Sequence, residues 1–158
     1  MKNLSRNKGF SLVELIIVIA IMTVLAMAIA PALIRYIEKS REATDIDGCD
    51  EVYRAMSNEL LSDKVVFDDT NPGAEFRVTV NQSGITVTTV GVSDAADHTD
   101  AIFEGLGVQA NNGNQYASAG LKTKSKNVSE NQTGASTHSY SVVLKVNGEM
   151  KKNIYFPN

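Results

Sequence analysis

One long apolar stretch, residues 10–34, limits what this chain can fold into more than any other feature of the sequence. Between Lys8 and Arg35 the sole ionisable side chain is Glu14, and the residues after Arg35 are polar and mixed. As an α-helix, residues 10–30 would be ~31 Å long, which matches the hydrocarbon core of a bilayer. We therefore predict one transmembrane helix followed by a domain outside the membrane.

A secretory signal peptide is the competing interpretation of this stretch. It would use the basic residues Lys2, Arg6 and Lys8 and a small-residue cleavage site after Ala28 or Ala30. The apolar stretch is, however, longer than the ~7 to 15 residues of a signal core, and it contains an acidic residue. Pro31 also follows the second of these sites directly. A transmembrane helix accounts better for these features.

Glu14 is the anomaly within the apolar stretch. A carboxylate in hydrocarbon costs ~2.5 to 3.5 kcal/mol on insertion scales, so it normally persists only with a partner. Hydrolysis of the bond between Gly9 and Phe10 would create one, because the new cationic α-amino group would lie four residues before Glu14. The pair could close within one chain or between neighbouring chains. Between neighbours it would neutralise both charges at a single axial stagger and so fix the register of assembly.

A resemblance to a known family is carried by residues 8–15, which are Lys8-Gly9-Phe10-Ser11-Leu12-Val13-Glu14-Leu15. With the apolar helix behind them, they resemble the signature of type IV prepilins and the related pseudopilins. The resemblance implies that a membrane-embedded aspartic prepilin peptidase cuts after Gly9 and methylates the new amine of Phe10. It also implies that Glu14 is needed for assembly.

Two further positions bear on this resemblance. Pro31 falls where such pilins commonly have a proline, whose missing N–H and ring clash weaken the preceding helical turn. Thr23 stands where many Gram-negative pilins have glycine. Any stretch that unwinds in a filament is therefore expected to be shorter here.

The resemblance implies an α+β type IV pilin fold, in which a long N-terminal helix packs on an antiparallel sheet of about four strands. The expected segments are a cleaved leader (1–9), a transmembrane and filament-core helix (10–34), an amphipathic helix half packed on the sheet (35–61) and a β-rich head (62–158). The motif-level match covers about a fifth of the chain, so the head is predicted from its own residues.

The amphipathic helix is predicted from apolar residues that recur at three- and four-residue spacing. This stripe comprises Ile46, Cys49, Tyr53, Met56 and Leu60, with Val52 beside it. The other faces carry Asp45, Asp47, Asp50, Glu51 and Arg54. Gly48 costs the helix ~1 kcal/mol. Cys49 is the only cysteine, which excludes an internal disulfide and suggests a buried small side chain.

Two β-hairpins are predicted in the head. Alternating apolar residues at 76–80 are followed by residues 85–90, which are rich in β-branched side chains. The second hairpin joins residues 140–146 to 149–156 through Asn147-Gly148, which favours a type I′ turn. One face of the sheet would present Tyr140, Val142, Leu144 and Val146 to the helix stripe.

Between the hairpins, Asp97 is predicted to cap a short helix that ends at Gly107, with Asp100 in its first turn. Its inward residues would be Ile102, Phe103 and Leu106. Residues 110–137 are rich in Asn, Ser, Thr, Gly and Gln, and they predict a long exposed loop.

Residue patterns for catalysis or metal binding are weak throughout the chain. Residues 45–50 and the aspartates at 94, 97 and 100 lack a proper calcium-loop spacing, and helix capping and solvation explain them. His98 and His138 have no nucleophile motif nearby. Lys122, Lys124 and Lys126 predict a solvated basic loop, and Asn127 and Asn131 begin permissive glycosylation sequons. We predict no enzyme activity, no cofactor and no metal.

The function implied by the resemblance is that of a structural pilus subunit. A prepilin in the cytoplasmic membrane would be processed by the peptidase and polymerised with other copies of itself, by an assembly platform and cytoplasmic ATPases. The resulting cell-surface filament would serve adhesion, aggregation or motility. Removal of Lys2, Arg6 and Lys8 would change the formal net charge from −3 to −6, and an acidic product is no general nucleic-acid binder.

Three alternatives stay open at this point. A pseudopilin of a type II secretion system would share the N-terminal chemistry. A single-pass anchored binding module would never polymerise, and a secreted enzyme would be released after Ala28. The absence of a C-terminal cysteine pair makes the chain more similar to Gram-positive clostridial pilins than to many Gram-negative ones.

Overall fold

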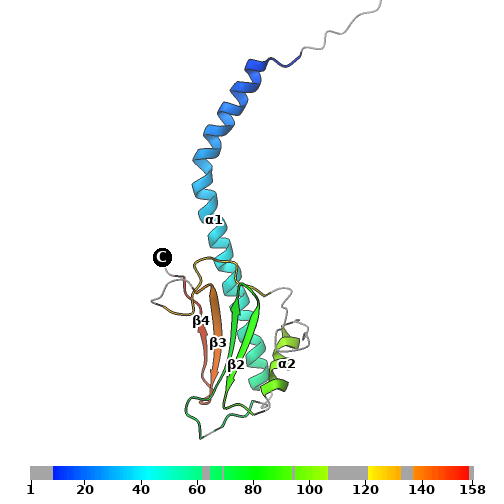
Figure 1. The fold of residues 1–158 in the computed structure, drawn as a ribbon, viewed down its shortest axis with the longest axis vertical. Coiled ribbons are helices and arrows are strands. Elements are labelled where there is room, and N and C mark those ends of the chain that lie inside the picture. The colour runs from blue at the N-terminus through cyan, green and yellow to red at the C-terminus, as the bar shows by residue number, and fades with distance from the viewer. Residues whose placement is uncertain are drawn as a thin grey trace, which may run out of the picture. The chain divides into compact units, whose positions relative to one another are not determined.

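The computed structural model of this chain describes residues 9–61, 65–68, 70–93, 95–106, 121–132 and 137–156. Its elements are α1 (Leu12–Leu61), β1 (Glu75–Asn81), β2 (Ile85–Val90), α2 (Ala95–Gly105), β3 (Ser139–Lys145) and β4 (Met150–Asn153), as Figure 1 shows. The chain divides into two compact units, Met1–Ile37 and Glu38–Asn158. This is the predicted α+β arrangement of a long N-terminal helix and a four-stranded antiparallel sheet.

The first unit contains the start of α1, whose apolar side chains are exposed. Phe10 is 80% exposed, and Leu15, Ile19 and Leu25 are each more than half exposed. The helix is long and apolar enough to cross a membrane, and its most apolar part is not buried within the protein. It continues through Pro31 without interruption. The Thr23 hydroxyl donates to the Ile19 carbonyl inside this helix.

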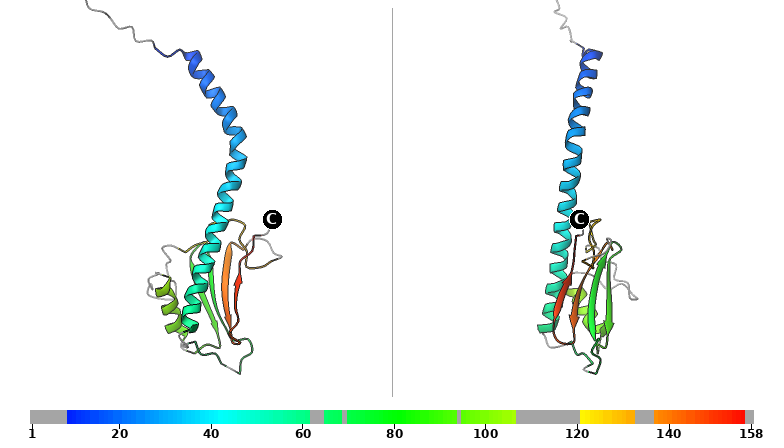
Figure 2. Two further views of the ribbon diagram at one scale, coloured as in Figure 1. Left: turned by 180° about the vertical axis from the view of Figure 1, so that it is seen from behind. Right: turned by 90° about the vertical axis from the view of Figure 1, so that its left-hand side faces the viewer.

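The sheet of the second unit has the strand order β2-β1-β3-β4, with antiparallel neighbours. Phe76, Val78 and Val80 of β1 lie opposite Leu144, Val142 and Tyr140 of β3, and all six side chains are buried. They share one core with Cys49, Val52, Ala55 and Met56 of α1. Figures 1 and 2 show this later part of α1 lying against the sheet. Both predicted hairpins are confirmed.

The buried stripe of α1 differs from the predicted one. Cys49, Val52 and Met56 are buried as expected, and Tyr53 is half-buried. Ile46 is 44% exposed, however, and the neighbouring Asp45 is 1% exposed. The prediction for these two residues was wrong because it took apolarity as the guide to burial, whereas the Asp45 carboxylate finds hydrogen-bond donors inside the head. The Leu60 side chain lies outside the described residues.

The turn of the second hairpin also differs from the prediction. A type I′ turn needs a positive φ at both central residues, but only Gly148 of this pair has one, at 78°. The Gly148 N–H donates to the Lys145 carbonyl (2.9 Å), and the Lys145 N–H donates to the Glu149 carbonyl (3.0 Å). The loop is therefore a three-residue one, in which a type I turn over Val146 and Asn147 precedes a left-handed glycine.

Helix α2 begins before its predicted cap. Ala95 is already helical, so Asp97 lies inside the first turn, where its charge favours the helix N-terminus. Ile102, Phe103 and Leu106 are buried, as predicted. Gly107, the predicted end, lies outside the described residues.

Residues 121–132 were predicted to be part of an exposed loop, and for this segment the prediction was wrong. Thr123, Ser125, Val128 and Ser129 are buried, whereas Lys122, Lys124 and Lys126 are exposed between them. Val128 belongs to the apolar core. Small hydroxyl side chains can be buried here because they form hydrogen bonds, so low apolar content did not mean exposure. Residues 107–120 and 133–136 lie outside the described part of the chain.

Gly48 makes room for Tyr140, and this leads to a first prediction. A Cβ at position 48 would lie 2.5 Å from the Tyr140 hydroxyl oxygen and 3.6 Å from its Cζ. Gly48→Ala should gain ~1 kcal/mol of helix propensity but lose more to overpacking, which typically costs about 1–3 kcal/mol. We expect a lower free energy of unfolding, measured by urea titration of the detergent-solubilised chain with near-UV circular dichroism.

The control for this prediction removes the clashing oxygen. In a Tyr140→Phe background, the same Gly48→Ala change should be neutral or stabilising, because the nearest remaining atom is at ordinary contact distance. Equal destabilisation in both backgrounds would contradict the packing explanation.

Candidate functional site

The predicted cleavage site lies immediately before α1. Gly9, Phe10 and Ser11 are not helical, and the helix begins at Leu12. Phe10 is 80% exposed, and a Cβ at Gly9 would meet nothing within 4 Å. The peptide bond between Gly9 and Phe10 is therefore in exposed, irregular backbone, the kind of segment that proteases reach most readily.

Glu14 forms a local contact that the sequence reasoning missed. Its Oε2 accepts a hydrogen bond from the Ser11 backbone N–H at 2.9 Å. Ser11 occupies the N-cap position and Glu14 the N3 position, so the two residues follow the capping-box pattern, in which the glutamate satisfies an N-terminal donor. The Ser-x-x-Glu spacing before an apolar run could have predicted this contact. Glu14 thus helps to set where α1 starts in the uncleaved chain.

Two carboxylates of α1 hold the segment 121–132 against the helix. Asp45 accepts the backbone N–H groups of Lys124 and Ser125, each at 2.7 Å. Two turns earlier, Glu38 accepts the Ser125 hydroxyl at 2.7 Å and the Lys126 N–H at 2.8 Å. These bonds turn both carboxylates inward and leave the lysine side chains exposed.

The pKa values of the two carboxylates are shifted in opposite directions. The hydroxyl hydrogen bond from Ser125 lowers the pKa of Glu38, and the Lys126 N–H acts in the same direction. Burial raises the pKa of Asp45, and this outweighs the opposing effect of the two backbone N–H groups that it accepts. Glu38 therefore favours the folded state when ionised, whereas ionisation of Asp45 carries a desolvation cost.

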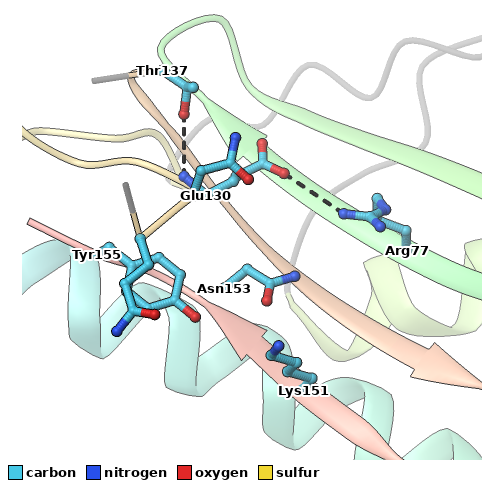
Figure 3. Close-up of a pocket in the computed structure, with 8 residues that line it drawn as sticks. Arg77, Glu130, Thr137, Lys151, Asn153 and Tyr155 are labelled. Carbon is cyan, nitrogen blue, oxygen red and sulfur yellow. Dashed lines mark hydrogen bonds and ion pairs between the residues drawn. The ribbon is translucent and has the colours of Figure 1, made fainter. Parts of the chain in front are cut away.

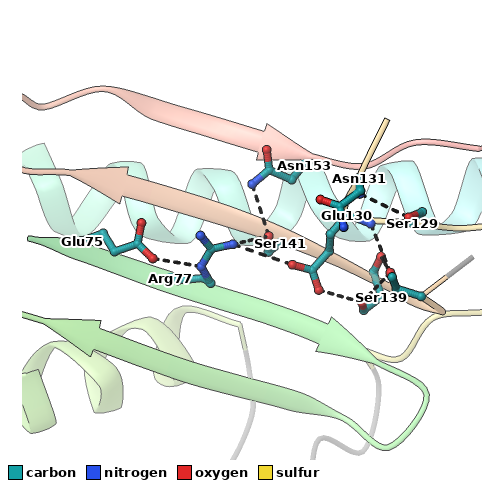
Figure 4. Close-up of polar contacts among 9 residues, drawn as sticks. Glu75, Arg77, Ser129, Glu130, Asn131, Ser139, Ser141 and Asn153 are labelled. Atoms are coloured by element: carbon teal, nitrogen blue, oxygen red, sulfur yellow. Dashed lines mark hydrogen bonds and ion pairs between the residues drawn. The ribbon is translucent and has the colours of Figure 1, made fainter. Parts of the chain in front are cut away.

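The sheet face that α1 does not cover carries a polar network, shown in Figure 4. Arg77 of β1 contacts Glu75 (Nε to Oε1, 3.1 Å) and Glu130 (NH1 to Oε2, 3.7 Å). Glu130 also accepts the Ser139 hydroxyl at 2.6 Å. Beside this network is a hollow of about 520 Å³, which we call the sheet-face pocket (Figure 3).

A second hollow, of about 480 Å³, is lined by basic and hydroxyl side chains and by Gln82. Arg41 of α1 and Lys124 and Lys126 of the anchored segment contribute its positive charge. Arg41 is itself paired with Glu38 at 3.4 Å.

His98 and Cys49 are both buried. The Nδ1 of His98 lies 3.2 Å from Glu59 Oε1, in a buried pair that joins α2 to the end of α1. Cys49 is buried, as predicted, and burial raises the pKa of its thiol to about 11, which makes it a poor nucleophile. Within the described residues, no group of three or more His, Cys, Asp and Glu could hold a metal ion.

Comparison with known proteins identifies the N-terminal region. Residues 4–30 match the family model described as the prokaryotic N-terminal methylation motif, and Gly9, Phe10 and Glu14 lie within that match. No curated protein and no solved structure matches the chain significantly. The motif is the type IV prepilin signature, so it supports a type IV pilin-like or pseudopilin precursor that is anchored in a membrane and processed by a prepilin peptidase.

The Asp45 contacts generate a second prediction. Asp45→Ala would leave two backbone N–H groups without their acceptor, at a cost of about 1–3 kcal/mol. We expect a correspondingly lower free energy of unfolding. Asp47→Ala is the matched control, because Asp47 is an exposed aspartate on the same helix. Equal effects of the two substitutions would show that the anchored segment does not depend on Asp45.

Glu38 generates a third prediction, on pH dependence. Its folded pKa lies below its ordinary value of 4.5, so its stabilising effect is complete above that pH and is lost as the pH falls through the folded pKa. The stability difference between the wild type and Glu38→Gln should therefore shrink as the pH falls below 4.5. Urea titrations at several pH values measure this difference, and a constant difference would contradict the prediction.

Proposed function

We propose that this chain is a structural subunit of a type IV pilus, made as a membrane-inserted prepilin and polymerised into an extracellular filament. The observation that carries the proposal is the apolar surface of α1. Side chains from Leu12 to Ile37 are 42% exposed or more wherever they are large and hydrophobic. Soluble monomers rarely expose so much contiguous apolar surface. Lipid covers such a helix before assembly, and the helices of other subunits cover it in a filament.

The N-terminal residues have matching roles in this proposal. The peptidase cuts the exposed bond after Gly9, and the new amine of Phe10 is methylated. The cationic amine then pairs with the Glu14 carboxylate of a neighbouring subunit. An assembly platform and cytoplasmic ATPases drive polymerisation, as the resemblance to type IV prepilins implies. The filament serves adhesion, aggregation or motility, and the lack of a cysteine pair leads us to propose a Gram-positive type of pilin.

The exact mass and N-terminal sequence of the protein in sheared cell-surface material test the proposal. A methylated Phe10 at the N-terminus of abundant filaments would support it. Processed protein that stays in the cell envelope, without surface filaments, would instead identify a pseudopilin. A mature chain that begins at Ile29 would mean ordinary secretion and would overturn the proposal.

Glu14 generates a fourth prediction, which separates its charge from its capping role. Glutamine can replace glutamate in a capping box but cannot neutralise an amine. If charge pairing drives assembly, Glu14→Gln and Glu14→Ala should both abolish filaments, while the protein is still made and inserted. Electron microscopy and immunoblots of sheared and membrane fractions measure this. Normal filaments from Glu14→Gln, together with none from Glu14→Ala, would assign Glu14 to helix capping instead.

A further inference from the structure

The sheet contributes three residues to the lining of the sheet-face pocket, Arg77 of β1 and Lys151 and Asn153 of β4, all on the face turned away from α1. Strand β3 lies between β1 and β4, and its Ser139 and Ser141 on the same face are 8% and 0% exposed and do not line the pocket. Asn153 of β4 is directly opposite Ser141, and Arg77 of β1 is opposite Val143, two residues further along β3. Both reach the Ser141 hydroxyl, each at 3.4 Å. These two hydrogen bonds hold the Arg77 and Asn153 side chains at the edge of the pocket.

One side of the pocket is formed by residues 130–132, and several hydrogen bonds hold this segment in place. Ser129 and Tyr155 pair through their backbones, with N–O distances of 2.8 and 2.9 Å. Glu130 is fixed by the Ser139 hydroxyl at 2.6 Å, and its backbone N–H donates to the Thr137 hydroxyl at 3.2 Å. Figure 3 shows Glu130, Arg77, Asn153 and Lys151 around the hollow, on elements that are far apart in the sequence. The site is therefore formed before any ligand arrives, which limits the entropy lost on binding.

The polar groups of the pocket define the ligand that fits. Asn131, Gln132 and Asn153 offer amide donors and acceptors, and Tyr155 offers a partly exposed ring. These groups suit a compact ligand with several hydroxyls. The volume of about 520 Å³ is within the range of small-molecule sites.

The charged side chains around the pocket limit the charge of the ligand that can bind. The Arg77 guanidinium is shared between Glu75 and Glu130. Lys151 is exposed and has no acidic partner within ion-pair distance among the described residues. The Lys151 ammonium is thus available to pair with one negative group of a ligand. The nearby Glu130 carboxylate would repel a doubly charged phosphate more strongly than a single carboxylate. A single carboxylate on a hydroxylated ring meets these conditions.

We propose that the sheet-face pocket binds an acidic monosaccharide unit of a glycan, with Lys151 facing the sugar carboxylate, the side-chain amides bonding its hydroxyls and Tyr155 lying against its ring. The site belongs to the folded head alone. It requires neither cleavage nor polymerisation, so it can be tested independently of the pilus proposal.

The test uses the full chain, ¹⁵N-labelled and held in a phosphocholine detergent, because sugar-based detergents would compete for the site. Glucuronic acid, galacturonic acid and N-acetylneuraminic acid are titrated as probes, with glucose and acetate as references. We expect saturable shifts in the side-chain amide signals of Asn131, Gln132 and Asn153 for at least one acidic sugar, at lower concentration than for either reference. Lys151→Gln should weaken that binding about two- to fivefold, as for an exposed ion pair.

The matched control is Lys122→Gln, which removes another exposed lysine that does not line the pocket. It should leave the binding of the acidic sugar unchanged. Three outcomes would overturn the proposal: no acidic sugar shifts these amide signals, acetate binds as well as the sugars, or the two lysine variants weaken binding equally. Either of the last two outcomes would show that the pocket attracts anions in general and does not recognise a sugar.

Discussion

The apolar surface of α1 is the constraint on which the rest of this structure depends. Burial of apolar surface is worth roughly 25 cal/mol per Å², so a helix with its large side chains mostly exposed over residues 12–37 cannot remain in water at equilibrium. Two environments can cover it, lipid tails and the apolar faces of other helices. They are nearly equivalent in polarity, so moving the helix from one to the other changes its hydrophobic free energy little. Specific polar contacts must then decide between the two environments.

Beyond residue 37, α1 also forms one layer of the head. Val52 and Met56 fill the core, whereas Gly48 leaves space for the Tyr140 hydroxyl. Asp45 and Glu38 extend this packing with hydrogen bonds to a segment more than 75 residues away in sequence. The core of the head therefore includes one face of α1, and substitutions at the buried positions of this half of the helix act on the fold.

The sequence predicts the features whose signals are local and periodic. The long apolar helix, both hairpins and the inward face of α2 follow from the spacing of apolar residues, and the structure has them. The burial of Asp45 does not follow, because it depends on backbone N–H groups of Lys124 and Ser125 that only the folded chain brings near. The buried serines of segment 121–132 were missed for the same reason. The sheet-face pocket combines residues from three distant segments, so no local pattern indicates it. The Ser11–Glu14 contact, in contrast, had a readable signal in its spacing.

The capping contact of Glu14 sharpens the argument about its charge. A hydrogen bond to a charged group contributes about 1.5–3 kcal/mol net, which is comparable to the ~2.5 to 3.5 kcal/mol that a carboxylate costs within hydrocarbon. The Ser11 N–H can thus offset much of the cost in the uncleaved chain, so the precursor tolerates Glu14 without a cation. That bond leaves the negative charge in place, and the other carboxylate oxygen can still accept a bond. A cationic amine from a neighbouring chain would add neutralisation, which no neutral cap supplies. If Glu14 directs assembly as proposed, the capping bond would lower its cost in the membrane before cleavage, and the amine of a processed neighbour would add the neutralisation that favours the assembled state.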